Sequence, residues 1–152
     1  MKYFDPNSIF FARHAQHIVL VHFPIALLIA GVTFDLLARF TRRPHFAIAG
    51  ALNLYGAALT APLAAITGVL AWRLQLEGAR LKGALLLHLC AALVVVLLTW
   101  ALAWFRLRLG RRSDPAAPLP LMFHAAGLVA VLAVAITAHL GGIVSGVVTL
   151  GG

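Results

Sequence analysis

The chain has 152 residues, of which 62% are hydrophobic and 11% are charged, and its mean hydropathy is +0.99. Soluble domains contain about 45 to 50% apolar and about 25% charged residues, so this composition excludes a soluble globular protein and indicates an integral membrane protein. The net charge of +8 would suit nucleic acid, but the arginines stand beside the ends of hydrophobic segments, where anionic lipid head groups are the usual partner. We therefore expect the lipid bilayer as a partner and no nucleic acid.

Four hydrophobic segments follow one another along the chain, each long enough for a span of about 20 residues. They predict transmembrane helices at residues 18–39, 46–72, 83–106 and 121–144. The connectors are short, which favours antiparallel neighbours. The predicted fold is an all-α integral membrane four-helix bundle with up-down-up-down topology, in a single transmembrane domain covering residues 1–152. No segment repeats at a fixed period, so we expect no internal duplication.

The distribution of positive charge predicts the orientation. The first and third connectors carry seven arginines, whereas the N-terminus and the second connector carry five lysines and arginines. By the positive-inside rule, the first and third connectors are cytoplasmic and both termini lie on the outer side. The N-terminal residues lack the basic and apolar regions of a signal peptide, so we expect no cleavage.

Three histidines lie within the hydrophobic segments at one predicted depth. His22 is near the start of the first segment, His88 near the start of the third and His139 near the end of the fourth. An imidazole in lipid costs free energy unless it has a partner, so the shared level indicates a site near the outer leaflet, and reversing the bundle leaves it shared. His17 lies at the same interface. Gly68 of the second segment reaches this depth, where a missing side chain leaves room for a flat group.

Haem b is the cofactor that these residues favour, because its iron takes two axial imidazoles from facing helices. The candidate pairs are His22 with His88 and His88 with His139, and a third histidine would then bond a propionate or a quinone. A copper or zinc site held by His22, His88 and His139 is one alternative. The other is a structural role, in which each histidine bonds a carbonyl or a threonine of the next helix.

The remaining polar residues of the segments have simpler interpretations. Asp35 precedes Arg39 by four residues, which predicts an ion pair within one helix turn. His124 lies near the inner end of the fourth segment, and a second haem there would need His45 of the first connector. Cys90 is expected to be a small buried side chain. No nucleophile and base constellation or phosphate-binding loop appears, so an enzymatic activity stays undecided and a redox subunit is favoured over a stand-alone enzyme.

A family resemblance rests on the stretch 17–28, HIVLVHFPIALL, followed by Asp35. This stretch resembles the opening signature of a four-helix bacterial membrane family catalogued as domain of unknown function 2231, which reads roughly His-Pro-x-x-Val-His-Phe-Pro-Ile. Ile18 stands where the family usually has proline. Later landmarks also look similar, namely Gly68, His88 and the His-x-Gly-Gly element at residues 139–142.

Members of this family occur fused to Rieske iron-sulfur or cytochrome c modules, which implies electron transfer in the bacterial inner (cytoplasmic) membrane. This chain has neither module, so the resemblance implies a separate redox protein or a larger membrane complex as partner. The predicted function is a membrane electron-transfer subunit that binds haem b and links the quinone pool to a periplasmic cytochrome c or iron-sulfur protein. A non-redox structural membrane subunit and a copper- or zinc-binding membrane protein are the alternatives.

Overall fold

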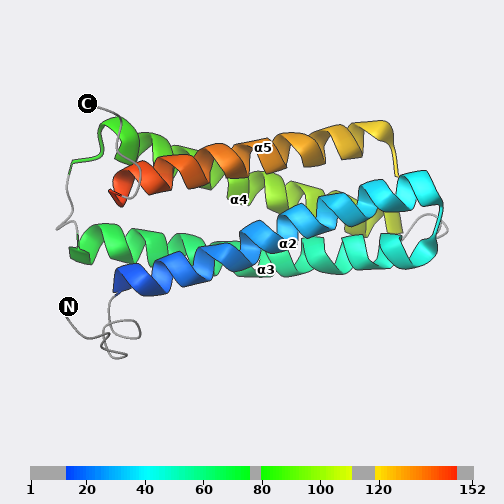
Figure 1. Ribbon diagram of the computed structural model, residues 1–152, viewed down its shortest axis with the longest axis horizontal. Coiled ribbons are helices and arrows are strands. Elements are labelled where there is room, and N and C mark those ends of the chain that lie inside the picture. Colours follow the sequence, from blue (N-terminus) through cyan, green and yellow to red (C-terminus); the bar gives the residue numbers. More distant parts are fainter. Residues whose placement is uncertain (1–12, 76–79, 111–118, 147–152) are drawn as a thin grey trace, which may run out of the picture.

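The computed structural model describes residues 13–75, 80–110 and 119–146, and these residues form four helices without a strand. The helices are α2 (Arg13–Thr41), α3 (Pro44–Gln75), α4 (Gly83–Gly110) and α5 (Leu121–Val144) (Figure 1). Each is long and apolar enough to cross a membrane. The prediction of an all-α membrane fold with four helices is confirmed. The clearest difference is at the N-terminus, where α2 begins five residues before the predicted 18 and so includes His17.

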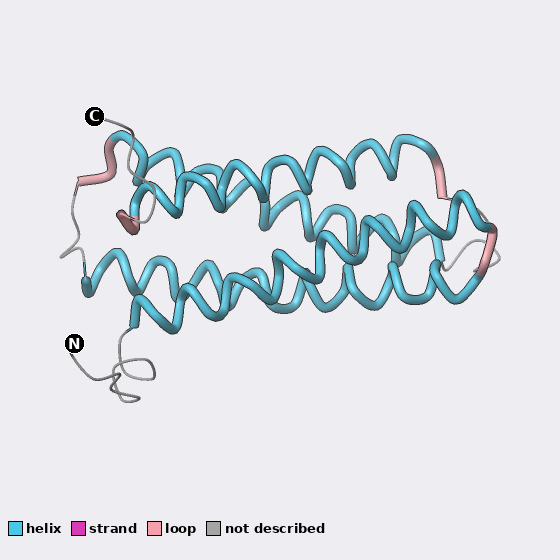
Figure 2. The backbone as a smooth tube through the Cα atoms, viewed as in Figure 1, coloured by secondary structure: helices cyan, strands magenta, loops and turns pink. Residues whose placement is uncertain are grey.

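The helices are arranged as two hairpins. Figure 1 shows successive helices running in opposite directions, with α2 packed most extensively on α3 and α4 packed on α5. We call α2 with α3 the first hairpin and α4 with α5 the second hairpin. The turn end is the end where Thr41 leads into Pro44, and the open end is the end where α2 begins at Arg13. Figure 2 shows the two hairpins close together toward the turn end and farther apart toward the open end.

The turn between α2 and α3 is tight because its residues stop one helix and start the next. Arg42 has a φ of 55°, in the left-handed region that ends many helices, and its N–H donates to the Ala38 carbonyl oxygen at 2.8 Å. Pro44 then begins α3, where its fixed φ suits the first helical position and its missing N–H costs nothing. The two helices of the first hairpin are therefore held in antiparallel contact by a short connection.

Close approach within the first hairpin depends on Gly31. A Cβ atom built on Gly31 would lie 2.9 Å from Cγ of Leu54, which is fully buried on α3. Small residues at such positions let membrane helices pack closely, because dispersion contacts and not water exclusion drive their association.

The same register of buried positions occurs in both hairpins. Each buried residue of α2 lies 71 positions before a buried residue of α4, and four buried residues of α3 lie 73 positions before four of α5. The pairs are Leu28 with Thr99, Gly31 with Leu102, Val32 with Ala103, Asp35 with Arg106, Gly50 with Phe123, Leu54 with Gly127, Ala57 with Ala130, and Ala61 with Val134. The repeat concerns the spacing of buried positions and not the sequence, since among these pairs only Ala57 and Ala130 share a residue type.

The buried core lies in the half of the bundle nearest the turn end. On the open-end side of Leu28 in α2 and of Thr99 in α4, no residue with described burial is buried. In the corresponding parts of α3 and α5, at residues 65–74 and 135–144, Ala71 alone is buried. The hairpins are thus joined firmly at one end, and the histidines that the sequence singled out lie at the other.

Candidate functional site

His17 packs against α3 within the first hairpin. Its Nδ1 lies 3.0 Å from Oγ1 of Thr67, and this hydroxyl donates its own hydrogen to the Ala64 carbonyl oxygen at 2.9 Å. The Thr67 oxygen therefore accepts from His17, whose Nδ1 carries a hydrogen. A Cβ atom on Gly68 would lie 3.0 Å from the His17 Cε1. The space that Gly68 leaves is thus taken by the edge of this imidazole.

His88 makes the corresponding contact within the second hairpin. Its Nδ1 lies 3.0 Å from the Thr137 carbonyl oxygen on α5, and a Cβ atom on Gly141 would lie 3.0 Å from its Cε1. Because a carbonyl oxygen only accepts, Nδ1 of His88 must carry the hydrogen. Nε2 then keeps its lone pair, which is the state in which histidine ligates a metal.

These two histidines occupy equivalent positions. His17 and His88 are 71 residues apart and Gly68 and Gly141 are 73 apart, the same offsets that relate the buried residues. The acceptors differ: His88 bonds the Thr137 carbonyl directly, whereas His17 bonds the Thr67 hydroxyl, which in turn donates to the Ala64 carbonyl, 73 residues before that of Thr137. A histidine seated on a glycine of the partner helix is therefore a repeated feature of the fold.

The helical period shows which way the two histidines face. Eighteen residues separate His17 from Asp35 and His88 from Arg106, which is five turns of about 3.6 residues each. Each histidine thus lies on the same helix face as its charged partner, about 27 Å nearer the open end. Asp35 and Arg106 join the two hairpins, whereas the printed contacts of His17 and His88 are with the partner helix of the same hairpin.

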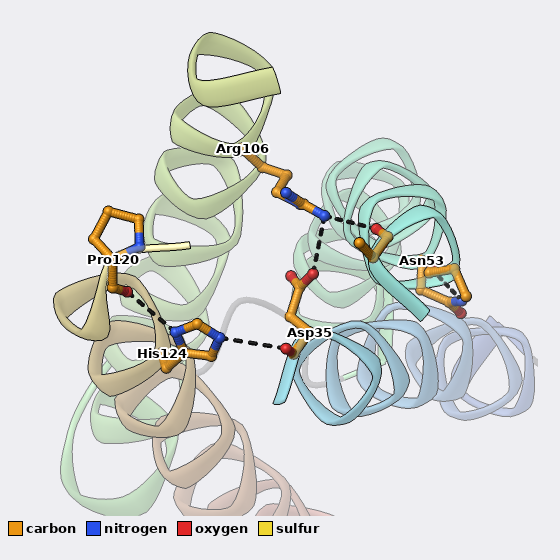
Figure 3. A network of polar contacts seen from close by, with 7 residues as sticks. Asp35, Asn53, Arg106, Pro120 and His124 are labelled. Atoms are coloured by element: carbon orange, nitrogen blue, oxygen red, sulfur yellow. Dashed lines mark hydrogen bonds and ion pairs between the residues drawn. The ribbon is translucent and has the colours of Figure 1, made fainter. Parts of the chain in front are cut away.

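An ion pair joins the two hairpins near the turn end. Nη2 of Arg106 on α4 lies 3.1 Å from Oδ1 of Asp35 on α2, and the two side chains are 8% and 2% exposed (Figure 3). The same Nη2 donates to the Ala47 carbonyl oxygen on α3 at 2.6 Å. His124 on α5 adds a contact from its Nε2 to the Asp35 backbone oxygen at 3.3 Å. Polar contacts at this level thus link all four helices.

The comparisons with known proteins place the chain in one family. Residues 13–151 match the sequence profile of the family described as predicted membrane protein (DUF2231). The chain belongs to the DUF2231 family. No curated protein and no solved structure was found to match it. Family membership and four apolar helices together make this a multi-pass membrane protein in contact with the lipid bilayer.

In this DUF2231 protein, two of the three histidines predicted at one depth lie on outward faces. His22 is exposed and its Nδ1 bonds the Ile18 carbonyl oxygen of its own helix. It stands thirteen residues before Asp35, about 220° around the helix from the buried face. His139 is also exposed, nine residues and about 180° from the buried Ala130. Of the predicted three, only His88 is engaged with a neighbouring helix.

No three histidine, cysteine, aspartate or glutamate side chains converge into a possible metal site within residues 13–75, 80–110 and 119–146. The structure therefore does not assemble His22, His88 and His139 around a bare ion. A pair of histidines on separate hairpins is the arrangement that the open end offers instead.

The predicted ion pair between Asp35 and Arg39 is wrong. Asp35 pairs with Arg106, and Nη1 of Arg39 donates to the Leu119 carbonyl oxygen at 3.1 Å. Asp35 lies on the buried face of α2. There the guanidinium of Arg106, from the other hairpin, compensates for the hydration that the carboxylate loses on burial. Sequence reasoning missed this pair because its members are 71 residues apart.

His124 and Cys90 of the DUF2231 chain also differ from expectation. His124 is 3% exposed, and its two ring nitrogens face the carbonyl oxygens of Pro120, at 3.1 Å, and Asp35. It is a structural member of the polar contacts at the turn end, whereas His45 lies exposed against the ring of Phe46. Cys90 is exposed and not buried, since it stands nine residues, about 180°, from the buried Thr99.

Proposed function

We propose that the protein is a membrane electron-transfer subunit that binds haem b between its two hairpins, with His17 and His88 as the axial ligands. The observation that supports this proposal is their equivalence: each stands eighteen residues, five helical turns, before Asp35 or Arg106, the two residues that join the hairpins. Haem b takes two axial imidazoles from facing helices of a bundle. Both histidines are at the open end, where the hairpins diverge and bury almost nothing between them.

The hydrogen bonds of the rings support a ligating role. The Thr137 carbonyl fixes the hydrogen of His88 on Nδ1 and so leaves Nε2 to face a metal, as a hydrogen-bonded histidine ligand requires. Gly68 and Gly141 let the two rings lie close to the partner helices, which leaves more width between the hairpins. Bound haem would supply one-electron chemistry, while the chain would hold, orient and shield it. Pairs that include His22 or His139 are less favoured, because these side chains are exposed.

The partners belong to the same proposal. The subunit would pass electrons between the quinone pool and a separate periplasmic protein, a cytochrome c or an iron-sulfur protein, or act within a larger complex of the bacterial inner membrane. What supports this is the resemblance of residues 17–28 to a family whose members carry such modules in the same polypeptide.

Optical spectroscopy tests the proposal. The full chain, purified from native membranes with its complex intact, is expected to show a reducible haem absorption band at one haem per chain. His88→Ala and His17→Ala should each abolish the band, because removing either imidazole leaves the iron with one axial ligand. His22→Ala and His139→Ala are matched controls, since both residues are exposed at the same end, and should retain it.

Two results would overturn the haem assignment. One is a wild-type protein without a reducible band at full occupancy of its complex. The other is a His88→Ala protein that keeps the wild-type band. Metal analysis of the same preparations distinguishes iron from copper or zinc.

A structural subunit is the second candidate, and one observation favours it. His17 and His88 each already bond a neighbouring helix, at Thr67 and Thr137. Interhelical hydrogen bonds of this kind contribute about 0.6 to 2 kcal/mol in membrane proteins. For this function, His88→Ala would lower the thermal stability of the chain or its assembly into a complex, and the wild-type protein would have no visible absorption.

A further inference from the structure

A basic cavity lies at the turn end, outside the candidate haem site. It has a volume of about 550 Å³ and opens beside the α2 to α3 turn, with further walls from Arg106 of α4 and from Leu119, two residues before α5. Four arginines, one aspartate and the exposed Phe40 are among its lining residues. The arginines are Arg39, Arg42, Arg43 and Arg106.

The charge of the lining is not balanced. Among the described residues that line the cavity, Asp35 is the one acidic residue, and its carboxylate already faces Arg106 at 3.1 Å. Arg39, Arg42 and Arg43 therefore present three positive charges to the cavity without a carboxylate of the lining to neutralise them. Anions are attracted to such a concentration of guanidinium groups in a cleft with low-dielectric walls.

Two of the guanidinium groups are anchored in place. Arg39 donates from Nη1 to the Leu119 carbonyl oxygen, and Arg106 donates from Nη2 to the Ala47 carbonyl oxygen. Each group has five N–H donors, so one bond to the backbone fixes it and leaves others for a ligand. Nε of Arg106 is buried and has no hydrogen-bond partner among the described residues, and the same holds for the two carboxylate oxygens of Asp35. A buried donor without an acceptor costs free energy, which an additional acceptor in the cavity would recover.

The surroundings of the cavity indicate that it lies at the depth of the lipid head groups. Three of the apolar spans end at this level, at Thr41, Pro44 and Leu109. Trp104 is exposed two residues before Arg106, and the guanidinium of Arg108 stacks on its ring with 4.4 Å from Cζ to the centroid. Tryptophan side chains gather where hydrocarbon meets head groups. Phe40, 78% exposed, offers an apolar surface beside the arginines for an acyl chain.

We infer that this cavity binds the phosphate group of an anionic phospholipid. Arginine forks bind phosphate oxygens through paired hydrogen bonds, and the cavity holds them at the depth where lipid phosphates lie. A zwitterionic lipid also has a phosphate, but its ammonium group would meet the same arginines. The inference does not depend on haem binding, because the cavity is at the opposite end of the bundle from His17 and His88.

Native mass spectrometry of the detergent-purified full chain tests the inference, with phosphatidylglycerol, phosphatidylcholine and inorganic phosphate as the probes. One phosphatidylglycerol per chain should be retained, with an affinity at least about tenfold above that for phosphatidylcholine. Each basic residue near a membrane surface contributes about 1 kcal/mol toward an anionic lipid, so Arg43→Gln should weaken binding about fivefold. Its side chain is exposed, and the substitution should leave the unfolding temperature unchanged.

Arg108→Gln is the matched control. It removes one exposed positive charge at the same end of the molecule, from a residue outside the lining, and should weaken phosphatidylglycerol binding less than twofold. Equal losses in Arg43→Gln and Arg108→Gln would overturn the inference, because general surface charge would then explain the binding. Saturable binding of inorganic phosphate without retention of phosphatidylglycerol would overturn the lipid assignment and identify a soluble anion as the ligand.

Discussion

At the scale of single residues, the glycines decide where the two equivalent histidines sit. Gly68 and Gly141 are the points where an imidazole edge approaches a helix backbone so closely that a Cβ atom would lie 3.0 Å away. Neither glycine is needed for an unusual backbone angle, since a positive φ occurs at Gly83 and Gly146 and not at these two. Their role is to make room for a ring.

Gly141→Leu is expected to displace His88 and break its bond to the Thr137 carbonyl oxygen. Overpacking of this kind costs typically 1 to 3 kcal/mol, so the free energy of unfolding should fall by about that amount. If haem is bound, its absorption band should be lost as well. Denaturant unfolding in detergent measures the first effect. Ala138→Leu, at an exposed position one turn earlier on α5, should be close to neutral, and an equal loss there would contradict the role given to Gly141.

Counting residues along a helix predicts the depth of a histidine but not the direction in which it points. The rise of a helix is fixed by its backbone hydrogen bonds, so counting from the segment ends placed His22, His88 and His139 at one level. Direction depends on which face meets another helix. In a membrane helix both the lipid face and the protein face are apolar, so hydropathy does not distinguish the exposed His22 from His17, which contacts α3.

At the scale of elements, composition alone predicts four helices, because about 20 apolar residues are needed to cross the hydrocarbon and no loop can be exposed there. The predicted ends are short of the observed ones, by five residues at the start of α2 and by three at the end of α3. Helical hydrogen bonding continues past the last apolar residue, whereas the hydropathy pattern stops with it. His17 belongs to such an extension, which is why it looked peripheral in the sequence.

Gly31→Val is expected to separate α2 from α3, since a Cβ atom there would lie 2.9 Å from the buried Leu54. A helix displacement cannot be absorbed by one flexible side chain, so a loss of about 1 to 3 kcal/mol in the free energy of unfolding should result. Ala26→Val is the control on the same helix, because Ala26 is exposed. Similar unfolding midpoints for both variants would show that the close packing of α2 on α3 does not depend on the missing side chain of Gly31.

At the scale of the whole molecule, the ion pair between Asp35 and Arg106 is the main polar link between the hairpins. Removing one member of a buried pair costs typically 3 to 5 kcal/mol, because the other charge stays buried and unpaired. Asp35→Asn and Arg106→Gln should each destabilise the fold to that extent. The double variant should lose clearly less than the two losses together, as a double-mutant cycle measures.

Asp35→Asn combined with Arg39→Gln is the comparison for that cycle. Arg39 bonds the Leu119 carbonyl and not Asp35, so the coupling between these two substitutions should be much smaller. A coupling as large as that of Asp35 with Arg106 would support the local pair that the sequence suggested.

The repeat between the hairpins is the feature that sequence inspection had least chance of detecting. Equivalent positions carry Leu28 and Thr99, or Asp35 and Arg106, which share burial but not chemistry. The spacing of inward positions along the helices is the same in both hairpins, while the residue type at each position depends on the side chains that it contacts there. The histidine and glycine contacts keep the same residue types in both copies, as does the buried pair Ala57 and Ala130.

The opposite charges at the equivalent positions 35 and 106 also determine which halves can associate. If the first hairpin paired with a copy of itself in this geometry, two Asp35 carboxylates would meet in the buried centre, and a pair of second hairpins would bring two Arg106 groups together. Both arrangements bury like charges without compensation. The ion pair therefore favours the association of unlike halves, so a complete bundle needs one first hairpin and one second hairpin.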